Sequence, residues 1–416
     1  MIAAAPESTA VATHPNAIGG ILIVVGTCIG AGLLALPVSN SPGGFGYSTV
    51  VMVLVWAVTT LGALFVLEVT QWLPRGANIV SIARATLGRK AEAVAWIVYL
   101  LLCYSLLCAY ISAGADILAG LTQGLNPDLV RSAAAAAFTL VLGSIVLRGI
   151  RSLDLVNRGL MLVKLATFGL LIFLVSPHID SDKLRQGELR LVLSSVSVAV
   201  TSFGFAIVIP SLLDYFNGNV KKVRTIILAG SLIPLGCYIA WNIVVMGTLP
   251  RMGPDGLLQV LASGDATDGL VKGLKDVLKV PAVTDASELF ASICVLTSFL
   301  GVSLALFDFL ADGLGLDRGT GSGRIKTGLL TFVPPVFIVS LYPEIFILAL
   351  SYAGLLVVVL SVLLPASMVW SGRYVTGVAK DYRVWGGKVT IMAEVGAGLL
   401  ILSIGLLEGL GLLKWV

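Results

Sequence analysis

Long apolar stretches divide this chain more clearly than any other feature of its sequence, and they limit what it can fold into. A helix needs roughly 20 apolar residues to cross the hydrocarbon core of a bilayer, and eleven stretches come close to or exceed that length. The sequence therefore predicts an all-α polytopic membrane protein with eleven transmembrane helices. The expected spans cover approximately residues 18–38, 47–73, 93–121, 132–147, 153–176, 191–214, 225–248, 287–312, 325–342, 345–370 and 389–413.

Composition agrees with a bundle embedded in a bilayer. Charged residues make up 12% of the chain, whereas soluble domains carry about 25%. The two histidines lie far apart and no metal-binding motif is present, so we expect no metal, no cofactor and no nucleic acid partner. No nucleophile–base pair points to an enzyme. The cysteines lie in apolar runs, where we expect small buried side chains: Cys28, Cys103, Cys108, Cys237 and Cys294.

The basic residues predict how the spans are oriented. Loops on one side of the membrane carry 17 lysines and arginines, and loops on the other side carry nine. Since positive loops stay in the cytoplasm, the first side is cytoplasmic. The N-terminal tail, residues 1–17, then lies on the cytoplasmic side of the bacterial inner membrane, and the C-terminus is periplasmic. Within the longest connection, 249–286, the periodic stretch Gly269–Lys279 predicts a short amphipathic surface helix.

The first span contains three glycines within seven residues, Gly26, Gly30 and Gly32. Each glycine weakens a helix by roughly 1 kcal/mol relative to alanine. One interpretation is close helix packing of the small-xxx-small kind. The interpretation we prefer is an unwound stretch at mid-membrane, where freed backbone N–H and C=O groups can bind a ligand.

The sixth span carries a similar interruption, because Gly204 and Pro210 can both break its hydrogen-bond ladder. Two broken helices five spans apart predict a five-plus-five inverted repeat, which in secondary transporters places the binding site between the breaks. The predicted halves are residues 18–176 and 191–370, and the eleventh span, 389–413, is an addition to them. Freed N–H groups at a half-helix N-terminus attract a carboxylate.

Two charged residues within the expected spans are candidates for ion coupling, because ionisable groups in a bilayer are costly. Lys164 lies about 9 Å inward of Arg158. It is a proton carrier, a fixed cation in place of sodium, or a lysine that snorkels to the interface. Glu68, near the cytoplasmic end of the second span, is either a coupling residue or a structural partner of freed backbone N–H groups.

Four further polar residues of the spans are assigned more locally. Asp116 is expected near the outer interface, with no special role. Asp308 and Asp312 lie at the inner end of the eighth span and are candidates for an inner-gate ion pair. Tyr110 needs a hydrogen-bond partner if buried, and a substrate carboxylate or a backbone carbonyl would serve.

These residues, taken together, resemble the hydroxy/aromatic amino acid permease family, and within it the tyrosine- and tryptophan-specific permeases, from about residue 18 to residue 413. Eight motifs in order carry the resemblance: Gly26–Gly32 with Leu34–Pro37, Leu67–Val69, Ala109–Ser112, Thr201–Phe205, Ile209–Ser211, Thr297–Val302, Leu306–Asp312 and Ser351–Gly354.

The resemblance implies a LeuT-like arrangement of eleven spans, proton-coupled symport and alternating access, in a protein that we expect to be a monomer. It implies that backbone N–H groups of Gly30, Ala31 and Gly32 bind the substrate carboxylate, with Thr27 and Cys28 beside the amino group. Tyr110 and Phe203 match a substrate-site tyrosine and an aromatic gate. Lys164 resembles the lysine that replaces sodium in proton-coupled relatives, near Gly26, Ile29 and Ser298.

One departure bears on the substrate. Relatives usually carry a histidine and small polar residues after the aromatic motif of span six, whereas Ala206, Ile207 and Val208 stand here. The pocket wall formed by Gly204 and Ala206 is therefore more apolar, which suits an aromatic ring. We expect tyrosine first, then tryptophan or phenylalanine. A serine/threonine permease and a sodium-coupled transporter of the same fold are the alternatives.

Overall fold

The computed structural model describes residues 16–119, 127–148, 150–253, 256–264, 266–317, 320–379 and 382–409, and within these ranges all regular elements are helices. Ten helical segments are long and apolar enough to cross a membrane, and the bent pair α1–α2 makes eleven. That number agrees with the prediction. The spans are, in order, α1 (Ala17–Cys28) with α2 (Gly32–Asn40), α3 (Phe45–Thr70), α5 (Arg89–Ala119), α6 (Pro127–Arg148), α7 (Ile150–Val175), α9 (Val196–Ser202) with α10 (Ile209–Tyr215), α11 (Val220–Thr248), α14 (Pro281–Leu314), α15 (Gly321–Leu341), α16 (Phe346–Val358) with α17 (Leu364–Tyr374), and α18 (Gly387–Gly409).

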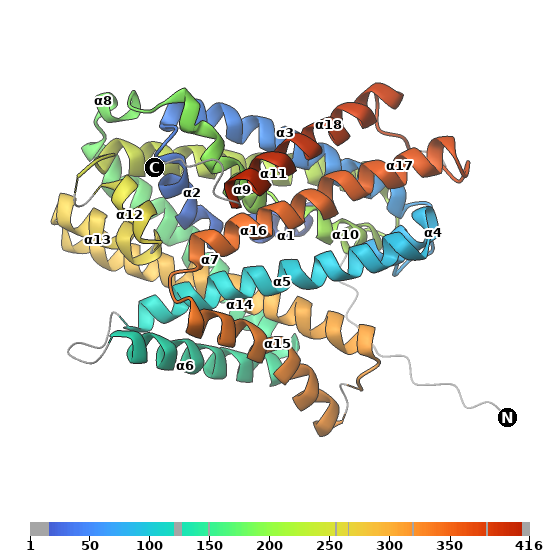
Figure 1. Ribbon diagram of the computed structural model, residues 1–416, viewed down its shortest axis with the longest axis horizontal. Coiled ribbons are helices and arrows are strands. Elements are labelled where there is room, and N and C mark those ends of the chain that lie inside the picture. Colours follow the sequence, from blue (N-terminus) through green and yellow to red (C-terminus); the bar gives the residue numbers. More distant parts are fainter. Residues whose placement is uncertain are drawn as a thin grey trace.

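Most of the long helices run side by side along the longest axis of the molecule (Figure 1). The two halves of the first span pack on α9 and α11, while α14 packs on α5 and α7. Large apolar side chains such as Leu162 and Phe173 are about three-quarters exposed, as expected for helices whose outer faces meet lipid. The core therefore surrounds the broken first and sixth spans, and α18 packs outside them against α16 and α17.

Short helices close the two ends of the bundle. One end holds α4 (Ile79–Leu87), and the other holds α8 (Ser181–Leu184), α12 (Leu257–Ser263) and α13 (Ala266–Leu278) (Figure 1). Helix α13 confirms the amphipathic helix expected at 269–279, since Leu270 and Leu274 are buried while Lys272 and Lys275 are exposed. It begins three residues earlier than predicted.

The structure corrects several expected details. Pro210 does not break span six, because it is the second residue of α10, where a proline costs no helical hydrogen bond. Span eight begins at Pro281 and not at 287, with the proline as its first residue. Span ten contains a π-helical turn, η4 (Val359–Leu363), that the sequence pattern did not predict. Residues 1–15 of the expected tail and 410–413 of the expected last span lie outside the described residues.

Candidate functional site

The first span is interrupted where the glycine motif predicted an unwound stretch. Helix α1 ends at Cys28, α2 starts at Gly32, and the two axes differ by 52°. Ile29 no longer has a helical backbone conformation, since its ψ is 88°. The N–H groups of Gly30 and Gly32 have no hydrogen-bond acceptor among the described residues, so this break exposes the donors that an anion would use.

Lys164 ties the break to two other spans. Its Nζ donates to the Ile29 carbonyl at 2.6 Å and to the Thr297 hydroxyl at 3.1 Å, and the side chain is only 1% exposed. Helix α7 supplies the lysine and α14 supplies Thr297. The lysine therefore does not snorkel to the interface, because its amine is held in the bundle interior by oxygen atoms of spans one and eight.

Ser298, the next residue of α14, also binds the backbone of the break. Its hydroxyl accepts the N–H of Ala31 at 3.1 Å, so the Ala31 donor expected to bind substrate is occupied in this structure. A Cβ at Gly30 would lie 2.4 Å from the Ser298 Oγ, and one at Gly32 would lie 2.8 Å from the Ser202 Oγ. The glycines thus allow close packing as well as unwinding, and both interpretations of the motif describe part of the structure.

The sixth span breaks beside the first. Helix α9 ends at Ser202, Phe203 and Gly204 leave helical geometry, and the short 3-10 helix η3 (Phe205–Val208) leads into α10. The Tyr238 hydroxyl, from α11, lies 2.6 Å from the Cys28 carbonyl and 2.9 Å from the Ser202 carbonyl. Tyr238 therefore joins the two breaks, since these are the last helical residues before each of them.

Aromatic and small side chains form the wall around the breaks. Phe203 packs edge-on against Tyr238, with 5.2 Å between ring centroids. Tyr110, on α5, is nearly buried beside Ser298. Ala206 is buried in η3, whereas Thr27 is exposed and Gly204 is half-buried. The break thus combines backbone polar groups with an apolar wall, which is the usual composition of a small-molecule site.

Two residues of this site were not predicted. Thr297 is the direct neighbour of Ser298 in the sequence, and the signal for it was a pair of adjacent hydroxyl side chains in an apolar run. Tyr238 is a tyrosine in the middle of the seventh span, and the rule that buried tyrosine hydroxyls need partners applies to it as well as to Tyr110. Gly26 faces Met161 of α7. The Met161 Cε lies 3.3 Å from the position that a Cβ on the glycine would take.

The two sides of the break differ in exposure. Every residue of α2 is buried, and its C-terminal end is tied to the connection after α11, because Arg251 donates to the carbonyls of Ser41 and Pro42 at 3.0 and 2.9 Å. The N–H of Glu188 donates to the same Pro42 carbonyl at 3.3 Å, and the Arg190 guanidinium lowers the pKa of the Glu188 carboxyl by bonding to it.

On the opposite side, α1 has an open face. Ile18, Leu22, Ile23 and Thr27 are all exposed, and they share one side of the helix because they recur at helical spacing. On α14, a stripe of half-buried and exposed residues runs from Ser298 past Gly301 and Ala305 to Asp308 and Asp312. Asp308 is half-buried and Asp312 is exposed, so both acids lie on the stripe that leads away from the break.

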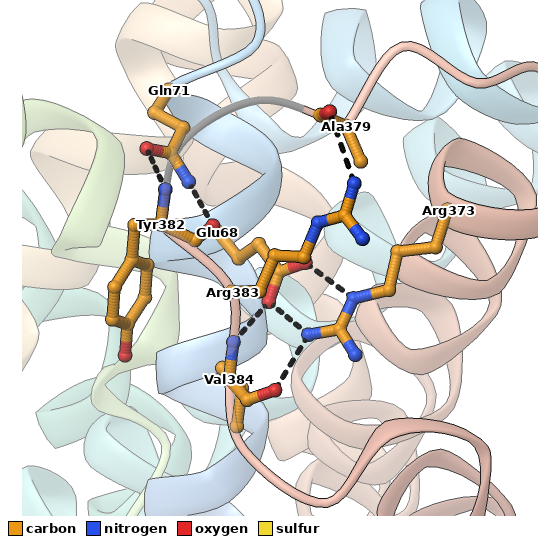
Figure 2. Close-up of polar contacts among 7 residues, drawn as sticks. All are labelled: Glu68, Gln71, Arg373, Ala379, Tyr382, Arg383 and Val384. Carbon is orange, nitrogen blue, oxygen red and sulfur yellow. Dashed lines mark hydrogen bonds and ion pairs between the residues drawn. The ribbon is translucent and has the colours of Figure 1, made fainter.

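Glu68 is held in a separate polar cluster at the end of α3 (Figure 2). Its carboxylate accepts two bonds from the Arg373 guanidinium, at 2.6 and 2.5 Å, and one from the N–H of Val384 at 2.7 Å. Gln71 bonds the Tyr382 backbone beside it. These contacts favour the structural one of the two roles left open for Glu68, since the carboxylate binds a backbone N–H and a buried arginine.

Glu68→Ala is expected to lower the free energy of unfolding by about 3–5 kcal/mol, because it leaves the buried Arg373 charge unpaired. The matched control is Glu92→Ala, which removes an exposed pair with Arg84 and should cost less than about 1 kcal/mol. Thermal melting of the purified proteins in detergent measures both. Equal melting temperatures for the two variants would contradict the structural role.

Asp116 lies in an ion-pair chain near the C-terminal end of α5. Arg131 binds the Asp116 carboxylate at 2.7 Å and Glu344 at 3.1 Å, linking α5, α6 and the connection before α16. Cys28, Cys103, Cys108 and Cys294 are buried and Cys237 is half-buried, and all five are free thiols, which agrees with their interpretation as small buried side chains.

Comparison with known proteins covers nearly the whole chain. The model of the tryptophan/tyrosine permease family matches residues 13–404. Tyrosine-specific transport system 1 of Haemophilus influenzae is 37% identical over 96% of this chain and 98% of the relative. A tryptophan-specific transport protein of Pseudomonas aeruginosa is 33% identical over 91% of each chain. Glutamine transporter 2 of Aliivibrio fischeri is 29% identical over 92% of this chain and 97% of the relative.

Proposed function

This chain belongs to the tryptophan/tyrosine permease family, and we propose that it is a proton-coupled symporter that imports an aromatic amino acid across the bacterial inner membrane. It is a transporter and not an enzyme. The observation that carries the proposal is the Lys164 amine, which binds oxygens of two spans directly beside the unwound part of the first span. Tyrosine is the proposed substrate, with tryptophan and phenylalanine next.

The substrate's main chain would bind between the two breaks. The free N–H groups of Gly30 and Gly32 suit the carboxylate, and the helix dipole of α2 adds to the attraction. The carboxylate could also displace the Ser298 hydroxyl from the N–H of Ala31. The carbonyl ends of α1 and α9, with Thr27 and Cys28, suit the ammonium group.

The side chain would lie against the apolar wall. Ring edges would come from Phe203 and Tyr110, and a methyl group from Ala206. Gly204 has no side chain and leaves room in the sixth span. Aromatic rings favour offset or edge-to-face contacts with such neighbours. The names of the relatives agree, since they specify tyrosine and tryptophan.

Coupling would act through Lys164. A sodium ion needs oxygen ligands, and the Ile29 carbonyl and the Thr297 hydroxyl are the oxygens that the ammonium group binds here. The lysine therefore occupies the place of a cation. A buried amine also loses its proton more readily than an exposed one, so that protonation can follow the transport cycle.

Alternating access would reverse the exposure seen here. The buried, tied α2 suggests a closed periplasmic side, and the exposed face of α1 suggests a route open to the cytoplasm. With the N-terminus inside, Asp308 and Asp312 would line the inner end of that route and act as its gate. We propose that the two halves form a LeuT-like inverted repeat that rocks about the breaks.

Uptake in proteoliposomes tests the proposal. Twenty amino acids are assayed with and without an inward proton gradient, in sodium and in potassium buffer. We expect the gradient to drive uptake of tyrosine, and more weakly of tryptophan or phenylalanine, equally in both buffers. Uptake that requires sodium would favour the sodium-coupled alternative, and preference for serine, threonine or glutamine would assign a different substrate.

A further inference from the structure

A second ionisable group is buried in the bundle, away from Lys164. Glu394 lies in α18, about 10 Å along the helix from its start at Gly387. The side chain is 1% exposed, and its Oε1 has no hydrogen-bond partner among the described residues. A buried carboxyl group without a partner is costly in either protonation state, and far more so when it is charged.

A polar group of the π-helical turn of span ten lies close to Glu394. Glu394 Oε1 and the Ser361 carbonyl oxygen both lie within 3.2 Å of one point, the position that a Cβ on Gly62 of α3 would take. Ser361 is completely buried, and its hydroxyl also has no partner among the described residues. Two hydrogen-bond acceptors therefore lie close to the same point beside the backbone of Gly62.

The sequence explains why that carbonyl loses its usual helical donor. In an α-helix the Ser361 carbonyl would accept the N–H of residue 365, but Pro365 has no N–H to donate. The chain responds with a π-helical turn, in which Leu364 bonds to Val359. π-helical turns of this kind are frequent at functional sites. A protonated carboxyl group can supply the donor that residue 365 cannot.

Charged and titratable groups of the packed elements are directed elsewhere. Glu68 of α3 and Arg373 of α17 bind each other, and Lys388 of α18 lies over the rings of Trp370 and Tyr374. Glu408 is near the far end of α18, where it lines a cavity of about 340 Å³ together with Tyr352 of α16. Helix α9 carries no ionisable side chain. No cation of the described residues pairs with Glu394.

The helix that leads into the π-helical turn packs on the broken sixth span. Val357, two residues before the turn, packs on Gly204, with 3.2 Å between its Cγ2 and the position of a Cβ there. The Thr201 hydroxyl of span six donates to the Leu350 carbonyl of span ten at 2.7 Å. Span ten therefore packs on the break of span six through Val357 and reaches the neighbourhood of Glu394 four residues later, at Ser361.

We propose that Glu394 is a second proton-binding site, in which its carboxylic acid donates to the Ser361 carbonyl and its proton occupancy is linked to the substrate pocket through the π-helical turn. Loss of the proton to water leaves a carboxylate facing a carbonyl oxygen, and their repulsion moves the turn and with it Val357. The link to the pocket rests on the proposed function, whereas the proton site itself does not.

Difference infrared spectroscopy of the protein in lipid nanodiscs tests this directly. We expect the carbonyl stretch of a protonated carboxylic acid at neutral pH, absent from Glu394→Gln and retained in the matched control Glu408→Gln. Saturating tyrosine should shift that band. Pro365→Ala gives the Ser361 carbonyl an amide donor, so the acid should lose its acceptor and its band should move to higher frequency.

Three results are decisive. A band that is equally strong in Glu394→Gln overturns the proton site. A band that tyrosine leaves unchanged, in a sample where tyrosine raises the melting temperature, overturns the link to the pocket. If no aromatic amino acid raises the melting temperature of any sample, the proposed substrate is wrong, and the band at neutral pH still supports the proton site. Glu394→Gln should melt like the unmodified protein, because its amide can donate to the same carbonyl.

Discussion

Lys164→Met is expected to abolish concentrative uptake while substrate binding survives. The variant keeps much of the side-chain length but removes the ammonium group that binds the Ile29 carbonyl and Thr297. Without a group whose protonation follows the cycle, substrate can only equilibrate, so inside and outside concentrations become equal despite a proton gradient. Lys164→Ala should give the same result. Uptake and counterflow in proteoliposomes measure accumulation and exchange separately.

Two further variants make the test specific. Lys183→Met removes a lysine that also binds a backbone carbonyl, that of Thr248, but from the short helix α8 at one end of the bundle, and it should accumulate substrate normally. Lys164→Arg keeps a charge that is not lost in proteins. It should bind substrate without concentrating it if Lys164 carries the proton, and should work if only a fixed cation is needed. Normal accumulation by Lys164→Met would make the lysine structural and leave Glu394 as the next candidate carrier.

Gly30→Val is expected to remove substrate binding while Lys164 stays intact. A Cβ at this position meets the Ser298 Oγ at 2.4 Å, and the larger side chain would cover the free backbone N–H groups of the break. Tyrosine at a hundred times its Kd should stabilise the unmodified protein by roughly 2.7 kcal/mol. The valine variant should lose that stabilisation completely in a melting assay.

The controls separate recognition from packing. Gly19→Val changes a glycine of the same span whose Cβ would meet no atom within 4 Å, and tyrosine should still stabilise it. Gly30→Ala combined with Ser298→Ala removes the close contact in the empty protein. We expect this double variant to fold but to bind poorly, because the added methyl group still blocks the carboxylate. Full binding by the double variant would mean that Gly30 serves packing only.

The bilayer explains why so much of the fold follows from the sequence. A span must be long, apolar and helical to satisfy its own backbone in lipid, and these requirements are local. The number of spans and the amphipathic α13 were therefore predictable. The interruption of span one followed from three glycines, and the resemblance to the permease family followed from motifs that lie in order along nearly the whole chain.

The tertiary structure decided which polar groups meet. Glu68 binds Arg373, 305 residues away, and local hydropathy contains no information about such a pair. Tyr238 joins two breaks that lie 174 residues apart along the chain, from Cys28 to Ser202. Glu394 was visible as an acid inside the last expected span, but its importance depends on what it faces.

The sequence by itself determined the number of spans and the class of the protein, because the length and apolarity of a span are set by its own residues. Only the folded chain determined the surroundings of individual charges. Lys164 has oxygen partners from two other spans, Glu68 has an arginine, and Glu394 lies buried near a carbonyl whose usual helical donor Pro365 removes. The free energy of a buried charge depends on the groups within a few ångströms of it, and those groups come from distant segments that packing alone brings together.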